Sequence, residues 1–297
     1  MSRPGDGSML CSPRSMRLEV TAVITTHARP ASVHEAIESV LGETHNDCEV
    51  IVVDDGGAFV PPVHFAPSIR VIRGSNLGVG RARNLGLAAA RGEFIVYLDD
   101  DDIAMPHRIH SLVDAARRHN AVLCFGMTRR TLDGTTLLED VPTDVVSGAI
   151  GFGDLLTCAP HVNAVLARTD TLRAIGGFDA GCDHFDDWSA WLRIADRDEV
   201  IWRIEEVVAE WRIHSEGLSA RVLTEQAMKS RILSLFRRLR RCLSPDNARA
   251  IAWAERVVHA AQIDTYDDYV AAMVAAQQPI KRVPAVPSMT LARARVP

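Results

Sequence analysis

The stretch Phe94-Ile95-Val96-Tyr97-Leu98-Asp99-Asp100-Asp101-Asp102 joins an apolar run to four consecutive acids. Five apolar residues bounded by a turn signal are typical of a buried β-strand. Four adjacent carboxylates repel one another, so they must face water or a cation. Ligands of an open parallel α/β sheet bind at the carboxyl ends of its strands. An acidic cluster at such an edge suits a hard divalent cation, and the alternative is a solvated acidic turn.

The chain before this stretch alternates between strand and helix patterns. Residues 18–25, 49–53 and 69–72 are short apolar or β-branched runs that predict strands, whereas residues 32–41 and 78–90 have helical patterns. This order of elements predicts an α/β fold with a parallel sheet.

The chain after the acids is less regular. Pro106 predicts the start of a helix directly after them, and Asp133-Gly134 predicts a hairpin turn. Helical patterns follow at 151–156, 170–175 and 188–195, with a strand pattern at 200–211. Residues 225–276 are helical in character throughout.

The composition excludes several classes of protein. Of 297 residues, 47% are hydrophobic and 24% charged, as in ordinary soluble domains. A net charge of -5 does not favour nucleic acid as a partner. The sequence contains no run of 18 apolar residues, which argues against a membrane-spanning helix. Six scattered cysteines without a C-x-x-C pair indicate reduced thiols, so we expect a cytoplasmic protein.

Two further groups of acids lie at predicted turns. Asp54-Asp55 follows the strand 49–53, where a carboxylate can accept hydrogen bonds from a base or ribose, although Asp-Asp-Gly is also a common turn. The acids of the segment Asp183–Asp187 precede Trp188 and its helix, which they can simply cap. Partial desolvation beside Phe185 and Trp188 can instead raise a carboxyl pKa toward that of a general base.

Residues 76–86 are rich in glycine and lie where a helix should begin. Their third glycine stands at Gly86, too late for the G-x-G-x-x-G dinucleotide fingerprint. A helix start with Arg81 and Arg83 can meet nucleotide phosphates, or it can be a tight turn with a solvated basic face.

His214 and Arg212 follow the predicted strand 200–211. A lone histidine is most often an ordinary surface or core residue. Near a cation site it can be a ligand, and an arginine beside it can pair with phosphate.

Taken in order, seven motifs of this chain resemble those of family-2 glycosyltransferases of the GT-A fold. Residues 23–30 resemble the family's P-T-Y-N-R-P turn, 36–44 its first helix and Q-T step, 52–57 V-V-D-D-G-S, and 76–86 N-x-G-x-x-x-A-R-N-x-G. Residues 97–102 resemble F-L-D-S-D-D, 176–179 G-G-F-D, and 186–193 E-D-W-x-x-x-L-R. The resemblance covers about residues 20–219. It implies a Rossmann-like, mixed but mostly parallel sheet flanked by helices, followed by a C-terminal helical extension.

The resemblance also implies site residues. Asp187 would be the catalytic base. The donor nucleotide would be bound by Thr26, Arg29, Asp54, Asp55, Arg83, Asp99 and Asp100. The metal, Mn²⁺ or Mg²⁺, would be held by Asp101 and His214, and the acceptor side would be formed or supported by Asp186, Trp188 and Arg212. The chain departs from the family pattern at Thr25, Ala28, Glu43, Gly57 and Asp186, where the family usually has Pro, Asn, Gln, Ser and Glu.

The implied activity is an inverting transfer of a sugar from a nucleotide-diphosphate donor to a hydroxyl or amine. The acceptor would be a glycan, a lipid-linked molecule or a small natural product. We expect a UDP-sugar as donor, with a GDP- or dTDP-sugar as the alternatives. Two other functions remain open, a non-catalytic GT-A-like nucleotide-binding protein and, ranked lower, a sugar-nucleotide pyrophosphorylase. The latter needs a glycine- and basic-rich first loop, which Thr26-His27-Ala28-Arg29 does not provide.

We expect four parts along the chain. A disordered leader (1–16) precedes the transferase domain (17–220), with its nucleotide-binding half (17–105) and acceptor half (106–220). A helical extension (221–278) and a flexible tail (279–297) follow. Apolar residues of the extension recur at helical spacing among basic ones, which predicts a helix packed on its own domain. A peripheral membrane contact through residues 228–243 is the alternative.

Overall fold

The computed structural model describes residues 18–27, 29, 32–43, 47–57, 59–65, 68–132, 134–137, 146–182, 184–215 and 228–276. The expected leader (1–16) and flexible tail (279–297) lie outside these residues, as do Asp133 and Asp183. The expected boundary between the transferase domain and the extension also falls outside them. The four-part division of the chain therefore stays a prediction.

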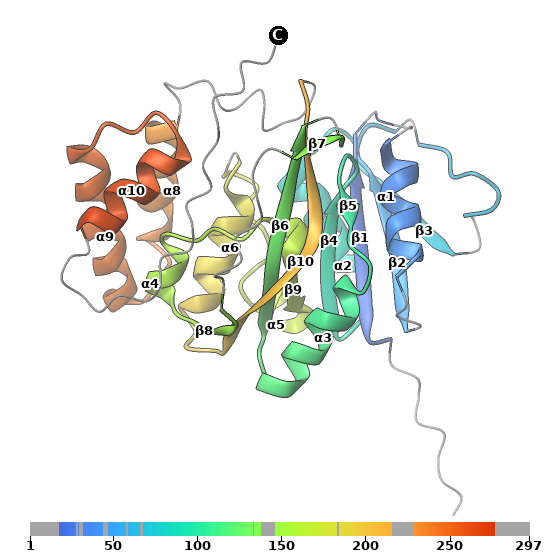
Figure 1. The fold of residues 1–297 in the computed structure, drawn as a ribbon, viewed down its shortest axis with the longest axis horizontal. Helices are drawn as coiled ribbons and strands as arrows, with labels where there is room; N and C mark the ends of the chain where they lie inside the picture. Colours follow the sequence, from blue (N-terminus) through green and yellow to red (C-terminus); the bar gives the residue numbers. More distant parts are fainter. Residues whose placement is uncertain are drawn as a thin grey trace, which may run out of the picture.

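The described chain forms a mixed α/β fold around one ten-stranded sheet (Figure 1). The strand order is β3-β2-β1-β4-β9-β6-β10-β5, with β7 paired to β6 and β8 to β10. The strands are β1 (Val20–Thr26), β2 (Cys48–Asp54), β3 (Ile69–Arg73), β4 (Phe94–Asp99), β5 (Ile103–Ala104), β6 (Leu123–Leu132), β7 (Thr136–Leu137), β8 (Gly148–Ile150), β9 (Val165–Arg168) and β10 (Ile201–Ile213).

Helices flank this sheet and continue beyond it. They are α1 (Ser32–Leu41), α2 (Val79–Ala89), α3 (Arg108–His119), α4 (Phe152–Leu155), the 3-10 helix η1 (Val162–Ala164), α5 (Thr169–Ala174), α6 (Asp186–Ala195), α8 (Met228–Leu239), α9 (Pro245–Ala260) and α10 (Tyr266–Ala276). The expected mixed sheet with flanking helices is confirmed. The helix predicted to begin at Pro106 begins at Arg108, because the intervening His107 adopts a positive φ of 66°.

The first four strands are parallel, so their carboxyl ends meet at one edge of the sheet. The register places Thr26 opposite Asp54 and Thr25 opposite Asp99. The antiparallel strand β9 then joins β4 to the second half of the sheet. This edge is the place where the acids of the sequence gather.

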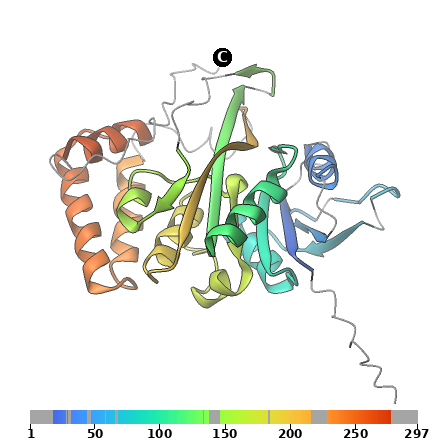
Figure 2. The ribbon, with the colours of Figure 1, turned by 60° about the horizontal axis from the view of Figure 1, so that its bottom comes forward.

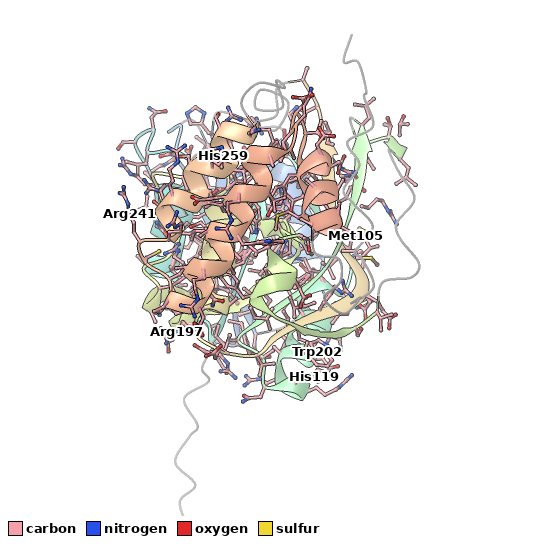
Figure 3. All side chains as sticks on the ribbon, turned by 90° about the vertical axis from the view of Figure 1, so that its left-hand side faces the viewer. Met105, His119, Arg197, Trp202, Arg241 and His259 are labelled. Atoms are coloured by element: carbon pink, nitrogen blue, oxygen red, sulfur yellow. The ribbon has the colours of Figure 1, made fainter. Side chains whose placement is uncertain are left out.

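Alternate side chains of β1 enter two separate cores, one on each face of the sheet. Ala22 and Ile24 pack with α1 and α3, whereas Val23 packs with α2, α5 and α6. Helices therefore cover both faces of the sheet (Figure 2). Gly86 of α2 lies so close to Val23 that a Cβ would collide with it, which explains a glycine inside this helix.

The helical extension packs on the same side of the sheet as α6 (Figure 1). The apolar stripe of α8 is buried in that core through Met228, Ile232, Leu235, Phe236 and Leu239. Helix α8 is therefore packed on its own domain, as the pattern of apolar residues predicts. None of the described helices is both long and apolar enough to cross a membrane.

Glu43, where the family usually has glutamine, is buried beside the start of α3. Its Oε2 accepts the Ile109 amide at 2.6 Å, and burial raises its pKa to about 7, although the nearby Arg108 lowers it. A raised carboxyl pKa means that the folded state binds a proton that the unfolded state releases. The unfolding free energy should therefore fall by up to about 3 kcal/mol between about pH 5 and pH 7 because of Glu43.

Urea unfolding of the wild type and of Glu43→Gln at pH 5, 6, 7 and 8 measures this contribution. The glutamine variant should lose that part of the slope, because an amide does not titrate. Equal slopes in the two proteins would show that Glu43 does not carry the proton. Asp114→Asn, an exposed acid on α3, is the matched control and should keep the wild-type slope.

Candidate active site

The loop after β4 is held by groups from β1 and its following turn. Thr26 Oγ1 donates to Asp100 Oδ2 at 2.6 Å, and Arg29 Nη1 donates to Asp100 Oδ1 at 3.1 Å and also to Asp101. His214 Nε2 lies 3.0 Å from Asp101 Oδ2. Burial raises the pKa of Asp100 to about 6, although the Thr26 hydrogen bond opposes it. Five of the predicted site residues therefore meet at one place.

Asp54 and Asp55 lie at the neighbouring strand end and bind backbone amides there. Asp54 accepts the amides of Gly57 at 2.9 Å and of Phe59 at 2.8 Å, and it pairs with Arg73. Asp55 accepts the amides of Leu77 and Gly78 at 2.8 and 2.9 Å. Both carboxylates thus shape the turns that border the edge. Their contact with a nucleobase stays a prediction.

Arg83 joins the two acidic motifs through one buried guanidinium. Its Nη2 donates to Asp99 Oδ1 at 2.9 Å, and its Nη1 donates to Asp186 Oδ2 at 2.8 Å. Burial opposes the charge of Arg83, but Asp186, Asp99 and then Asp187 raise its pKa further above the usual value. Burial likewise opposes ionisation of Asp99, yet Arg83 lowers the pKa of that carboxyl overall. The side chain of Arg83 is therefore an internal bridge, and its contact with a nucleotide stays a prediction.

Asn84 fixes the loop that carries the second acidic motif. Its side chain accepts the Phe178 amide and donates to the Phe178 carbonyl, both at 2.8 Å. Gly177, at a φ of 71°, leaves room for this side chain, because a Cβ there would collide with it. The N-x-G-x-x-x-A-R-N-x-G and G-G-F-D motifs are thus neighbours in space.

Asp102 and His161 form a second group with Asp99 that could bind a cation. One ligand atom from each of the three lies within 4.8 Å of the others. Asp102 accepts the Arg212 amide at 2.7 Å and a hydrogen bond from Asn163. Burial lowers the pKa of His161, which keeps its imidazole neutral and able to bind metal. Asp99 was predicted to bind the donor, whereas Asp102 and His161 were not predicted as site residues, and only the acidic run pointed to Asp102.

Asp187 lies in the first turn of α6, directly after Asp186. Burial raises its pKa to about 7, with the charge of Asp186 adding to the shift and that of Arg83 opposing it. Its Oδ1 accepts the Trp188 amide at 2.7 Å. A carboxyl group that titrates near neutrality has the proton affinity that suits a general base. The raised pKa and the nearby acids Asp99 and Asp186 support that role without testing it.

Trp188 and Arg212, which were predicted on the acceptor side, bind other groups with their side chains. The indole of Trp188 is fully buried, and its Nε1 donates to the Leu155 carbonyl at 2.6 Å. The guanidinium of Arg212 pairs with Glu35 and, at 3.3 Å, with Glu210. Trp188 therefore contacts the core, and the side chain of Arg212 is held between acids.

The fold of this chain is that of the GT-A glycosyltransferases. Staphylococcus aureus TarS 1–349, solved in complex with UDP-GlcNAc, superposes with a TM-score of 0.64 at 14% identity, over 81% of this chain and 72% of that chain. The mannosyltransferase PcManGT from Pyrobaculum calidifontis, solved with GDP-Man and Mn²⁺, gives a TM-score of 0.60 at 18% identity, over 91% of this chain and 77% of that one.

Sequence comparison links the first half of the chain to one family. Residues 21–147 match the family model described as glycosyl transferase family 2. An uncharacterized glycosyltransferase of Nostoc sp. is 27% identical over 176 residues, which are 54% of either chain. The chain spans between about a third and about half the length of the curated relatives it matches. Residues 21–147 are thus similar to family-2 glycosyltransferases, and the chain has the GT-A fold.

Proposed function

We propose that this chain is a metal-dependent, inverting glycosyltransferase that moves a sugar from a nucleotide-diphosphate donor to an acceptor hydroxyl or amine. The main support is the arrangement around Arg83, which holds the acidic loop 99–102 and the start of α6 together. Asp187, whose pKa is raised to about 7, lies in that same turn of α6. The complexes of TarS with UDP-GlcNAc and of PcManGT with GDP-Man support a nucleotide-sugar as donor. A UDP-sugar is the first candidate.

The proposed chemistry assigns the proton to Asp187. Its ionised carboxylate accepts the proton of the acceptor hydroxyl while the acceptor oxygen attacks the anomeric carbon. The bond from this carbon to the diphosphate oxygen breaks, and the diphosphate leaves with the bonding electrons. Attack from the face opposite the leaving group inverts the configuration of the sugar, in a transition state with oxocarbenium character.

The donor atoms at this edge fit a divalent cation. Carboxylate oxygens and neutral imidazole nitrogens are ligands that suit Mn²⁺, and carboxylates suit Mg²⁺. Asp101 and His214 would hold the cation, and Asp99, Asp102 and His161 would provide a second set of ligands beside them. A bound cation supplies charge neutralisation for the leaving diphosphate.

Calorimetry with UDP, GDP and dTDP, each with and without Mn²⁺, tests the proposed donor and metal. The wild type should bind one of these nucleotides more tightly when Mn²⁺ is present. Asp101→Ala should weaken that metal-dependent binding at least about 10-fold, because a carboxylate ligand is lost.

Asp114→Ala, an exposed acid of α3, is the matched control and should bind as the wild type does. If His161→Asn loses the metal effect and Asp101→Ala keeps it, the cation belongs to the second set of ligands. Absence of metal-dependent binding of every nucleotide would overturn the proposal and favour a non-catalytic GT-A-like domain.

A further inference from the structure

Aromatic side chains of the helical extension pack around Trp188, the residue that follows the proposed base. The Trp188 ring meets Phe236 of α8 at a centroid distance of 5.9 Å. It also meets Tyr266 and Tyr269 of α10 at 5.8 and 5.6 Å, and all three contacts are edge-to-face. Aromatic pairs in this geometry contribute beyond the area that they bury. Two helices of the extension therefore fix the first turn of α6.

The two tyrosines of α10 also reach the segment before η1. Tyr266 Oη accepts the Ala159 amide at 3.2 Å, and Tyr269 Oη donates to the Leu156 carbonyl at 2.5 Å. Burial raises the pKa of Tyr266, and the negative charge of Asp187 adds to the shift, so the Tyr266 phenol stays neutral near the carboxylate. The extension is thus close enough to Asp187 to affect its surroundings.

A forked ion pair ties α8 to the loop that leads into α6. Arg238 Nε and Nη2 donate to Asp179 Oδ2 and Oδ1 at 2.8 and 2.6 Å. Asp179 Oδ1 also accepts the Gly181 amide at 3.0 Å. Bidentate pairs of this kind fix orientation as well as distance. Arg238 therefore holds the beginning of the segment that leads from Asp179 to Asp187.

Side chains of α2 and α8 bind the described residues at both ends of this segment. Asn84 binds Phe178 before it, Arg83 binds Asp186 at its other end, and Arg238 binds Asp179 between them. The first two belong to α2, inside residues 21–147, which match the family model, whereas Arg238 lies about ninety residues beyond that match.

We propose that the helical extension supports the catalytic site from outside it, and that Arg238 is a positioning residue that orients Asp187 through the segment that joins Asp179 to Asp187. This inference rests on the proposed function, because it assumes that Asp187 is the base. A displacement of a catalytic group by about 1 Å can lower the rate about 100-fold. The extension would then set the rate of transfer without touching the substrate.

Arg240 on the same helix provides a matched control. It pairs with Glu255 of α9 at 2.7 Å, inside the extension, and its side chain is 49% exposed against 45% for Arg238. Replacing either arginine with glutamine removes one exposed ion pair, which should cost at most about 1 kcal/mol. Both variants should therefore unfold at nearly the same temperature.

The two variants differ in what they should do to the site. Amide hydrogen exchange in the 297-residue chain should be faster over residues 178–188 in Arg238→Gln than in the wild type or Arg240→Gln. The activity assay uses a nucleotide-sugar of the nucleotide that binds in calorimetry, with water as the acceptor, and measures release of the nucleoside diphosphate. In this assay kcat should fall about 10-fold in Arg238→Gln and stay unchanged in Arg240→Gln. The KM of Arg238→Gln for the donor should stay within about twofold. Arg238→Lys, which keeps the charge without the fork, should recover part of kcat.

Equal exchange over residues 178–188 in the two glutamine variants would overturn the inference, whatever their turnover. Faster exchange with unchanged kcat would overturn the coupling of this segment to the base. If the exchange difference appears while the wild type releases no nucleoside diphosphate from any donor, the positioning of the segment is supported and the proposed function is what fails.

Discussion

Asp187→Asn is expected to lower the rate of sugar transfer by about 10²–10⁴, because a positioned general base is worth that factor. Asparagine has nearly the shape of aspartate, and its Oδ1 can still accept the Trp188 amide. The variant should therefore keep the fold and the affinity for the donor nucleotide. Turnover with a nucleotide-sugar, together with nucleotide binding by calorimetry, measures both properties on the same protein.

The pH dependence of the wild type provides a second measurement of this base. Burial raises the pKa of Asp187 to about 7, so the protonated, inactive form predominates below that pH. The rate should rise with pH through about 7 and then level off. The residual activity of Asp187→Asn should lack this rise. Asp170→Asn, an almost fully exposed acid on α5, should keep the wild-type rate and profile. If Asp187→Asn keeps most of the turnover, the base is another group.

The elements of the parallel half were predictable because their signals are local. A continuous apolar run closed by acids predicts β4, and the β-branched run before Asp54 predicts β2. The helical character of residues 225–276 predicts one continuous helical stretch, whereas the described part of it, residues 228–276, contains three helices. Ser244-Pro245 shows one of the breaks in the sequence itself, since proline favours the first turn of a new helix.

The candidate site was predictable only as a set of acids at one edge of the sheet. The parallel register brings the ends of β1, β2 and β4 together, so residues at those ends had to be neighbours. The partners of the acids were not predictable from spacing. Arg83 and Asp186 lie 103 residues apart, and no local pattern marks His161 as a neighbour of Asp99. Such contacts depend on how the two halves of the sheet pack.

Arg83→Met is expected to lower the unfolding free energy by about 3–5 kcal/mol, because it leaves buried acids without their counter-charge. The arginine side chain is 7% exposed, and it holds Asp186, which is 4% exposed, together with Asp99. Methionine fills much of the same volume but cannot donate to either carboxylate. Urea unfolding at pH 7 measures the loss, and the slope of the transition shows whether the folded state has changed.

The pH and two further variants distinguish this cause from a simple packing defect. Arg83 lowers the pKa of Asp99 in the folded state. The stability that this pair contributes is therefore present above the pKa of Asp99 in the unfolded chain, and it is lost as the pH falls through the lower pKa of Asp99 in the folded protein. The difference in unfolding free energy between wild type and Arg83→Met should therefore narrow as the pH is lowered below about 4. Adding Asp186→Asn to Arg83→Met should restore part of the loss, because one unpaired charge is removed. Arg118→Met, which breaks an exposed pair on α3, should cost less than about 1 kcal/mol. A gap that stays constant with pH, with no recovery in the double variant, would assign the loss to packing instead of charge.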